Sequence, residues 1–161
     1  MNTDVGFKEA NLVHAASCIF WRHGFSFFPE FPYAKGSVDT LFVRKNEVVI
    51  AEFKRMHRSM LDTIVSQTER MEQFDPHSEL EKHCFKTRKW KLSLLWLCDA
   101  WDKESVDWWM GPAKDLMPKC QFGRSWSKGS EDLRADLGKH PDNWSPYSIL
   151  WAYREKVLSS R

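Results

Sequence analysis

The fold of this chain is decided by residues 38–54, VDTLFVRKNEVVIAEFK. Residues 38–44 and 47–54 are rich in β-branched and aromatic side chains, and this composition predicts two strands. Only Lys45 and Asn46 separate the two runs, so we expect a tight antiparallel hairpin between them. The other expected helices and strands lie on either side of this hairpin in the sequence.

The polar residues of the hairpin gather at one end. A two-residue turn would place Asp39 directly opposite Glu52, and a four-residue turn would place it opposite Lys54. Because side chains two apart share a strand face, both registers put the three groups on one face. Two adjacent carboxylates repel each other and are costly to bury, and a divalent cation would neutralise them. The alternative is an ordinary surface hairpin whose polar end is solvated.

The remaining elements follow from hydrophobic periodicity and from helix-stop signals. The chain therefore runs helix, three strands, helix, strand, which predicts an α/β fold with a mixed sheet. After residue 100 the pattern loosens, and we expect short additional helices packed on the sheet. The expected helices are 7–23, 58–74 and short ones near 104–110, 131–138 and 146–158, and the other strands are 25–31, edged by Pro29, and 92–98.

Composition limits the class of protein. The 161 residues suit a single domain spanning 1–161, and the net charge of +2 gives no bulk signal for nucleic acid. The four cysteines contain no C-x-x-C pair, so no zinc site is indicated; Cys18 and Cys98 lie in apolar stretches and are expected to be buried. Neither a signal peptide nor a membrane-spanning run is evident, so we expect a cytoplasmic protein.

Tryptophan is unevenly distributed. Eight of the nine tryptophans fall at or after residue 90, which separates a C-terminal part, about 100–161, from the part about 7–99 that carries the hairpin. Core packing is the default expectation for these rings, and base stacking or a dimer contact is the alternative.

Two polar side chains interrupt otherwise apolar helix stripes. Glu9 precedes Leu12 by three positions in the first helix, and Gln67 follows Ile64 by three in the second. Both could face the hairpin's polar end. Glu9 could instead be a favourable first-turn acid, and Gln67 an amide satisfied within the core.

Several basic residues could contact phosphates. Those nearest the hairpin or in the basic, Trp90-containing segment are Lys35, Arg55, Arg58, Lys86, Arg88 and Lys89. Cations interleaved with aromatic rings are consistent with nucleic-acid binding. A solvated, charged connector explains the same segment equally well.

Taken together, these features resemble the PD-(D/E)xK nuclease superfamily. The resemblance covers residues 7–99 and rests on Glu9, on the Gly36-Ser37-Val38-Asp39 run, on Ala51-Glu52-Phe53-Lys54, and on Gln67 in the following helix. It differs in having Val38 where a proline often precedes the aspartate, and Met71 where one branch has tyrosine. The resemblance implies a restriction-endonuclease-like αβββαβ core, which makes residues 7–99 a nuclease core.

The resemblance also implies chemistry. Asp39 and Glu52 would bind Mg²⁺, or Mn²⁺ in its place, with the Phe53 carbonyl as a further ligand. Lys54 would orient or deprotonate the attacking water or stabilise the developing charge. Glu9 would bind a second metal or a metal-bound water, and Gln67 would orient Lys54 or the phosphate.

Three functions remain open at this stage. The first is a metal-dependent nuclease that hydrolyses phosphodiester bonds, in DNA rather than RNA, and that works as a homodimer by resemblance. The second is a catalytically inactive protein on the same fold that binds nucleic acid or a partner. The third is an unrelated α/β domain.

Overall fold

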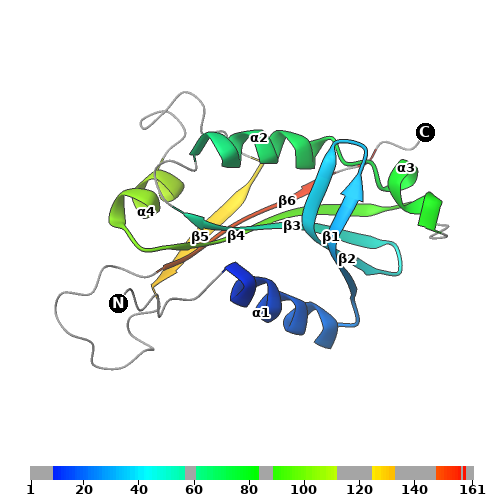
Figure 1. Ribbon diagram of the computed structural model, residues 1–161, viewed down its shortest axis with the longest axis horizontal. Helices are drawn as coiled ribbons and strands as arrows, with labels where there is room; N and C mark the ends of the chain where they lie inside the picture. Colours follow the sequence, from blue (N-terminus) through cyan, green and yellow to red (C-terminus); the bar gives the residue numbers. More distant parts are fainter. Residues whose placement is uncertain are drawn as a thin grey trace, which may run out of the picture.

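A computed structural model describes residues 9–56, 61–83, 89–111, 125–132, 148–156 and 158. Its strands form one six-stranded mixed sheet in the order β1-β2-β3-β4-β6-β5 (Figure 1). The β3–β4 pair is parallel and the other neighbouring pairs are antiparallel. The elements are α1 (Glu9–Arg22), β1 (Ser26–Tyr33), β2 (Gly36–Arg44), β3 (Glu47–Met56), α2 (Leu61–Glu72), α3 (Pro76–Leu80), η2 (Glu81–His83), β4 (Lys91–Ala100), α4 (Lys103–Met110), β5 (Ser127–Asp132) and β6 (Ser148–Lys156).

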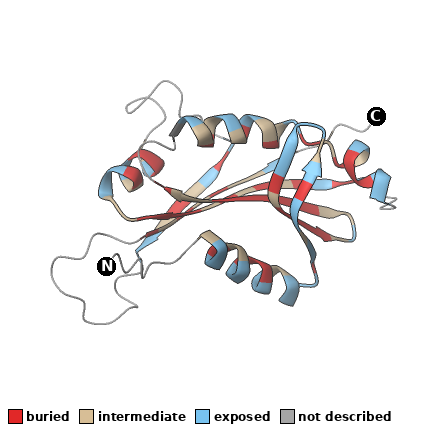
Figure 2. Ribbon diagram, in the orientation of Figure 1, coloured by how far each residue is buried: buried red, intermediate tan, exposed pale blue. Residues whose placement is uncertain are grey.

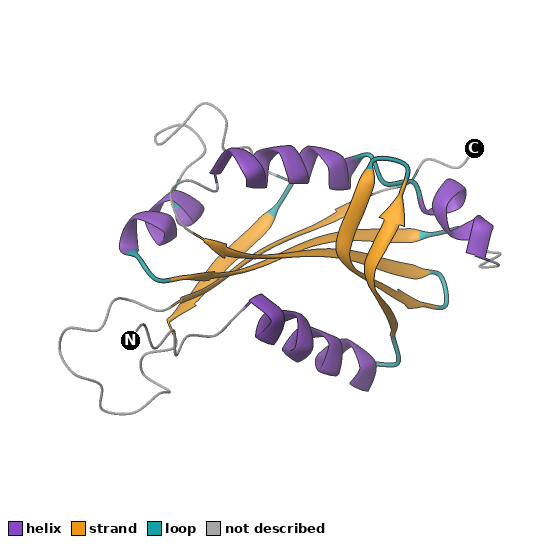
Figure 3. Ribbon diagram, in the orientation of Figure 1, coloured by secondary structure: helices purple, strands orange, loops and turns teal. Residues whose placement is uncertain are grey.

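Helices cover both faces of the sheet. Figure 3 shows α1 below the strands, with α2 and α4 above them. Two apolar clusters match this arrangement, and Figure 2 shows that the central strands are mostly buried. Leu41 and Ile50 belong to the cluster beneath α2, whereas Phe42 and Phe53 belong to the cluster against α1. The predicted α/β class with a mixed sheet is confirmed.

The predicted register of the hairpin is confirmed along its paired length. Arg44 pairs with Glu47 and Leu41 with Ile50 across the turn. Lys45 has a φ of 53°, as the first residue of a two-residue hairpin turn commonly does. Strong alternation with a short turn therefore fixed which side chains share a face.

Strand β1 forms one edge of the sheet, as Pro29 predicts. It carries a second proline, Pro32, and both side chains are exposed. Between them Glu30 has a φ of 49°, a left-handed conformation that is uncommon outside glycine. The edge strand is therefore irregular next to the point where β2 carries Asp39.

The helix expected at 146–158 is wrong, because Ser148–Lys156 is strand β6. Ser148, Leu150 and Ala152 are buried in alternation along β6, which pairs with β4 over its whole length. Residues 131 and 132 end strand β5, and the rest of 131–138 lies outside the described residues. The helix near 104–110 is present as α4. The C-terminal part thus widens the sheet as well as adding a helix.

One of the two cysteines expected to be buried is exposed, whereas the tryptophans agree with the expectation of core packing. Cys98 is buried, but Cys18 lies on the outer side of α1 and is exposed. Among the described tryptophans after residue 89, Trp90, Trp96, Trp108, Trp109 and Trp126 are buried. In the part of the chain that the structure describes, no helix is both long and apolar enough to cross a membrane.

Candidate functional site

The candidate site lies where β2 separates from β3. Their pairing runs from Arg44–Glu47 to Thr40–Ala51 and stops there, while β3 continues beside β4 to Met56. At the point of separation the Phe53 N–H donates to Asp39 Oδ2 over 2.8 Å. Because the N–H and C=O of one residue face the same neighbouring strand, the Phe53 carbonyl also faces this fork.

Four predicted residues meet at this fork from three segments. Lys54 Nζ lies 3.3 Å from Glu9 Oε1 and 3.7 Å from Asp39 Oδ2. The Glu52 carboxyl group lies close to that of Asp39, which raises its pKa. Glu52 is only 3% exposed, whereas the side chains of Lys54, Asp39 and Glu9 are 15%, 30% and 43% exposed. The site therefore has a buried floor at Glu52 and an open rim at Glu9.

The surroundings of Glu52 disfavour its ionised form. Burial, the Asp39 carboxylate and the hydrogen bond to Asp39 together raise the pKa of Glu52 to about 8, and Lys54 and Arg70 offset part of this rise. In the metal-free protein Glu52 is therefore protonated near neutral pH.

Lys54 is stabilised as a cation. Burial alone would lower the pKa of Lys54, but the carboxylates of Asp39, Glu9 and Glu52 outweigh it and the net pKa is raised. An ammonium group can neutralise negative charge and donate hydrogen bonds, but it cannot accept a proton. Of the roles considered for Lys54, this environment favours charge stabilisation over general-base catalysis.

The donor set suits a hard cation that uses few protein ligands. Within the described residues, no group of three or more His, Cys, Asp or Glu side chains is arranged to hold a metal ion. Asp39 and Glu52 are adjacent, but Glu9 is bound to Lys54 instead. Mg²⁺ typically uses one or two carboxylates and completes its shell with water and phosphate oxygens. Two adjacent carboxyl groups, Glu52 buried and Asp39 partly exposed, fit that requirement.

Helix α2 carries the predicted residue Gln67, for which no hydrogen bond to the fork is seen in the described part of the chain, and Arg70, which the sequence did not suggest. Gln67 is half-buried, and its Oε1 atom is buried without a hydrogen-bond partner among the described residues. Arg70 follows Gln67 by three positions and lies close enough to lower the pKa of Glu52. The sequence signal that could have identified Arg70 is its position one helical turn after Gln67. In the sequence, however, it looks like any solvated helix arginine.

Of the predicted phosphate contacts, Arg55 is already paired with a buried carboxylate. It follows Lys54 and so points to the opposite face of β3, where Arg55 Nε lies 3.3 Å from Oδ2 of the fully buried Asp99. Lys89 is exposed but lies at the far end of the sheet, near Asn46 in the hairpin turn. Lys35 is exposed in the β1–β2 turn. Arg58, Lys86 and Arg88 lie outside the described residues.

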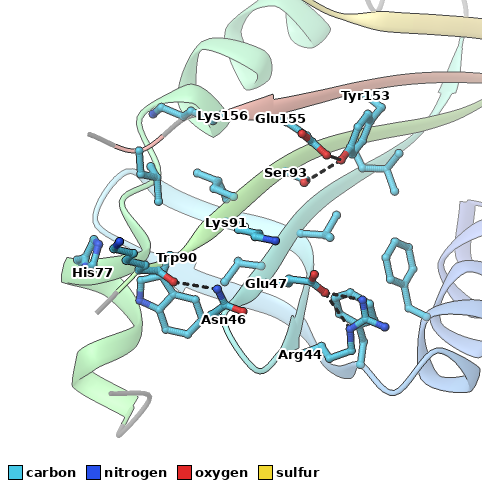
Figure 4. A pocket seen from close by; sticks show the side chains of 18 of the residues that line it. Arg44, Asn46, Glu47, His77, Trp90, Lys91, Ser93, Tyr153, Glu155 and Lys156 are labelled. Atoms are coloured by element: carbon cyan, nitrogen blue, oxygen red, sulfur yellow. Dashed lines mark hydrogen bonds and ion pairs between the residues drawn. The ribbon is translucent and has the colours of Figure 1, made fainter. Parts of the chain in front are cut away.

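A large groove of about 1470 Å³ lies at the far end of the sheet from the fork. Figure 4 shows its wall, where Tyr153 lies between Ser93 and Glu155, and Arg44 is paired with Glu47. None of the four residues at the fork lines this groove. Arg44 and Glu47 on its wall neutralise each other, and size alone does not make the groove the chemical centre.

Comparisons of this chain with known protein families, with curated proteins and with solved structures find no match.

Proposed function

We propose that this protein is a metal-dependent nuclease of the PD-(D/E)xK type, hydrolysing phosphodiester bonds in DNA. The observation that carries the proposal is the convergence of Glu9, Asp39, Glu52 and Lys54 at the β2–β3 fork. The element order through β4 agrees with the αβββαβ core of the resemblance. The ends of the parallel strands β3 and β4 also meet here, where open α/β sheets commonly bind ligands.

A coincidental surface hairpin is a poor explanation of this convergence. Such a hairpin would leave its polar end solvated, yet Glu52 is buried and its neighbouring carboxyl raises its pKa. Burying the Glu52 carboxyl group beside the partly exposed Asp39 carboxylate costs folding free energy. Local destabilisation of this kind is typical of functional sites.

Each residue has a role in the proposed reaction. Mg²⁺ held by Asp39 and Glu52, with the Phe53 carbonyl, would polarise the phosphate and lower the pKa of a water ligand. Lys54 stabilises the negative charge that develops on the phosphate oxygens. Glu9 positions the Lys54 ammonium group through their 3.3 Å contact and accepts hydrogen bonds from water at the exposed rim.

The direct test is DNA cleavage. The purified protein is incubated with plasmid, linear and branched DNA, and with RNA, in Mg²⁺ or Mn²⁺. Asp39→Asn and Lys54→Ala are each expected to lower the cleavage rate by at least about 100-fold, because each removes a charge at the reacting phosphate. Asp62→Asn and Lys103→Ala are controls that remove the same charges from exposed helix positions.

The outcomes separate the competing functions. Cleavage that persists in both site variants would overturn the site assignment. DNA binding without cleavage of any substrate would favour the inactive binding protein on the same fold. Cleavage of RNA alone would keep the chemistry and replace the substrate.

A further inference from the structure

Arg70 is a charged residue close to the candidate site that lacks a hydrogen-bond or ion-pair partner among the described residues. It is half-buried, yet its guanidinium makes no hydrogen bond or ion pair with any other described residue. A guanidinium has five N–H donors, and burying part of it without partners is unfavourable. Such a group is expected to have a ligand that the described residues do not supply.

The path of the Arg70 side chain is marked by Gly36. Arg70 Nη1 lies 3.3 Å from where a Cβ atom would stand on Gly36, which is closer than most such contacts. Gly36 also has a φ of 135°, which favours glycine. The start of β2 therefore leaves room for the guanidinium to pass across the backbone.

The surroundings of Arg70 connect it with the fork. Its positive charge lowers the pKa of both Tyr33 and Glu52, although burial leaves each pKa raised overall. The buried Glu79 carboxylate lies nearby but accepts the Ala34 N–H and is paired with Lys82. Arg70 thus adds positive potential beside Glu52 without being neutralised.

Distance along β2 separates Arg70 from the reacting centre. Gly36 and Asp39 are three residues apart, which is about 10 Å in an extended strand. A phosphate held by Arg70 would therefore neighbour the one at Asp39 and Glu52 on the same nucleic-acid strand. Lys35 is exposed in the adjoining turn and extends the line of cations away from the fork.

The charge balance at the fork agrees with an anionic ligand. Asp39, Glu52 and Glu9 carry three negative charges when ionised, against the two cations Lys54 and Arg70. A divalent cation would turn the net charge of the group from −1 to +1, which suits a phosphodiester. Without Arg70 the same group would be neutral.

We propose that Arg70 is a phosphate-binding residue that holds the phosphodiester next to the scissile one, across Gly36. The choice of nucleic acid as the ligand rests on the proposed function. Arginine suits this role because its planar fork can bind two phosphate oxygens at once. Arg70 acts on substrate position, and the reacting phosphate is left to the residues at the fork.

The test measures binding of a labelled single-stranded DNA oligonucleotide in EDTA, where cleavage cannot interfere, over a range of salt concentrations. Arg70→Ala is expected to weaken binding about tenfold, the effect of one charge-assisted hydrogen-bonded contact. The slope of log K against log salt should fall by about 0.7, the value for one phosphate contact on a single strand. Arg70→Lys should keep the slope and lose part of the affinity.

Arg22→Ala is the matched control, because Arg22 is an exposed helix arginine away from the fork. An equal fall in slope for Arg22→Ala, or no fall for Arg70→Ala, would overturn the inference. If Arg70→Ala fails to fold, Arg70→Gln keeps the side-chain length and answers the same question. If Arg70→Ala lowers the salt slope but the natural protein cleaves no substrate, the Arg70 site is supported and the nuclease is refuted. If the natural protein cleaves DNA but Arg70→Ala leaves the salt slope unchanged, the nuclease is supported and the Arg70 site is refuted.

Discussion

The buried Glu52 carboxyl should make the metal-free protein less stable as pH rises. Its pKa is raised from 4.5 to about 8 in the folded chain. Between these values the folded state holds a proton that the unfolded state has released. The free energy of unfolding therefore falls by about 1.4 kcal/mol per pH unit across this window. The total loss above pH 8 has an upper bound of about 5 kcal/mol, a large part of a typical domain's stability.

Glu52→Gln should remove this loss, because the amide keeps the shape of the side chain and does not ionise. We expect the variant to be more stable than the natural protein at pH 8.5 in EDTA, and the two to converge near pH 4.5. Urea denaturation followed by tryptophan fluorescence, repeated at half-unit steps of pH, measures the difference. Glu131→Gln, which removes an exposed carboxyl group from β5, is the control and should leave the slope in place.

Metal provides a second arm of the same experiment. Mg²⁺ should restore stability to the natural protein at pH 8.5, because binding to the folded state alone is stabilising. It should do little for Glu52→Gln, which lacks one of the two carboxylates. An equal pH slope in the natural protein and in Glu52→Gln would refute the reasoning, and so would an equal response to Mg²⁺.

Three further perturbations test the fold around the site by denaturant unfolding. Gly129→Ala should cost about 1–3 kcal/mol, because the added Cβ would lie 2.5 Å from the Trp151 ring; a neutral effect would contradict that packing. Arg55→Ala should lower the free energy of unfolding by about 3 kcal/mol, because the buried Asp99 carboxylate loses its ion-pair partner. Arg55→Lys keeps the positive charge and should restore part of this stability. Gly24→Ala should cost about 1 kcal/mol, because Gly24 ends α1 with a φ of 80°, and unchanged stability would argue against this cap.

The geometry of the hairpin was predictable because its information is local. A two-residue turn and the alternation of side chains predicted that Asp39, Glu52 and Lys54 share a face, and the observed pairing follows this register as far as Thr40 and Ala51. The same alternation places Arg55 on the opposite face of β3, where it is paired with Asp99.

Strand β6 was not predictable in the same way. Its apolar residues Ile149, Leu150 and Tyr153 satisfy helical spacing, while Leu150 and Ala152 satisfy strand alternation. The choice was made by pairing with β4, about 50 residues earlier in the chain. Long-range pairing of this kind overrides local preference and leaves little trace in a short window of sequence.

Arg70 illustrates a different limit. Its helix position was readable, but its significance depends on Gly36, which the β1–β2 turn brings beneath it. Glu9 was easier, because an acid that interrupts an apolar stripe is conspicuous in the sequence. Sequence analysis therefore identified Glu9, which interrupts an apolar helix stripe. It missed Arg70, which has an ordinary helix position but lacks a hydrogen-bond partner among the described residues.

The two prolines of β1 also limit how copies of this chain could associate. A proline has no N–H to offer to an added strand, so Pro29 and Pro32 interrupt any continuous ladder along that edge. The other edge, β5, is short and ends in the exposed acids Glu131 and Asp132, which would repel the same edge of a second copy. Among the described strands, neither edge therefore favours extension of the sheet from one copy of this chain into the next.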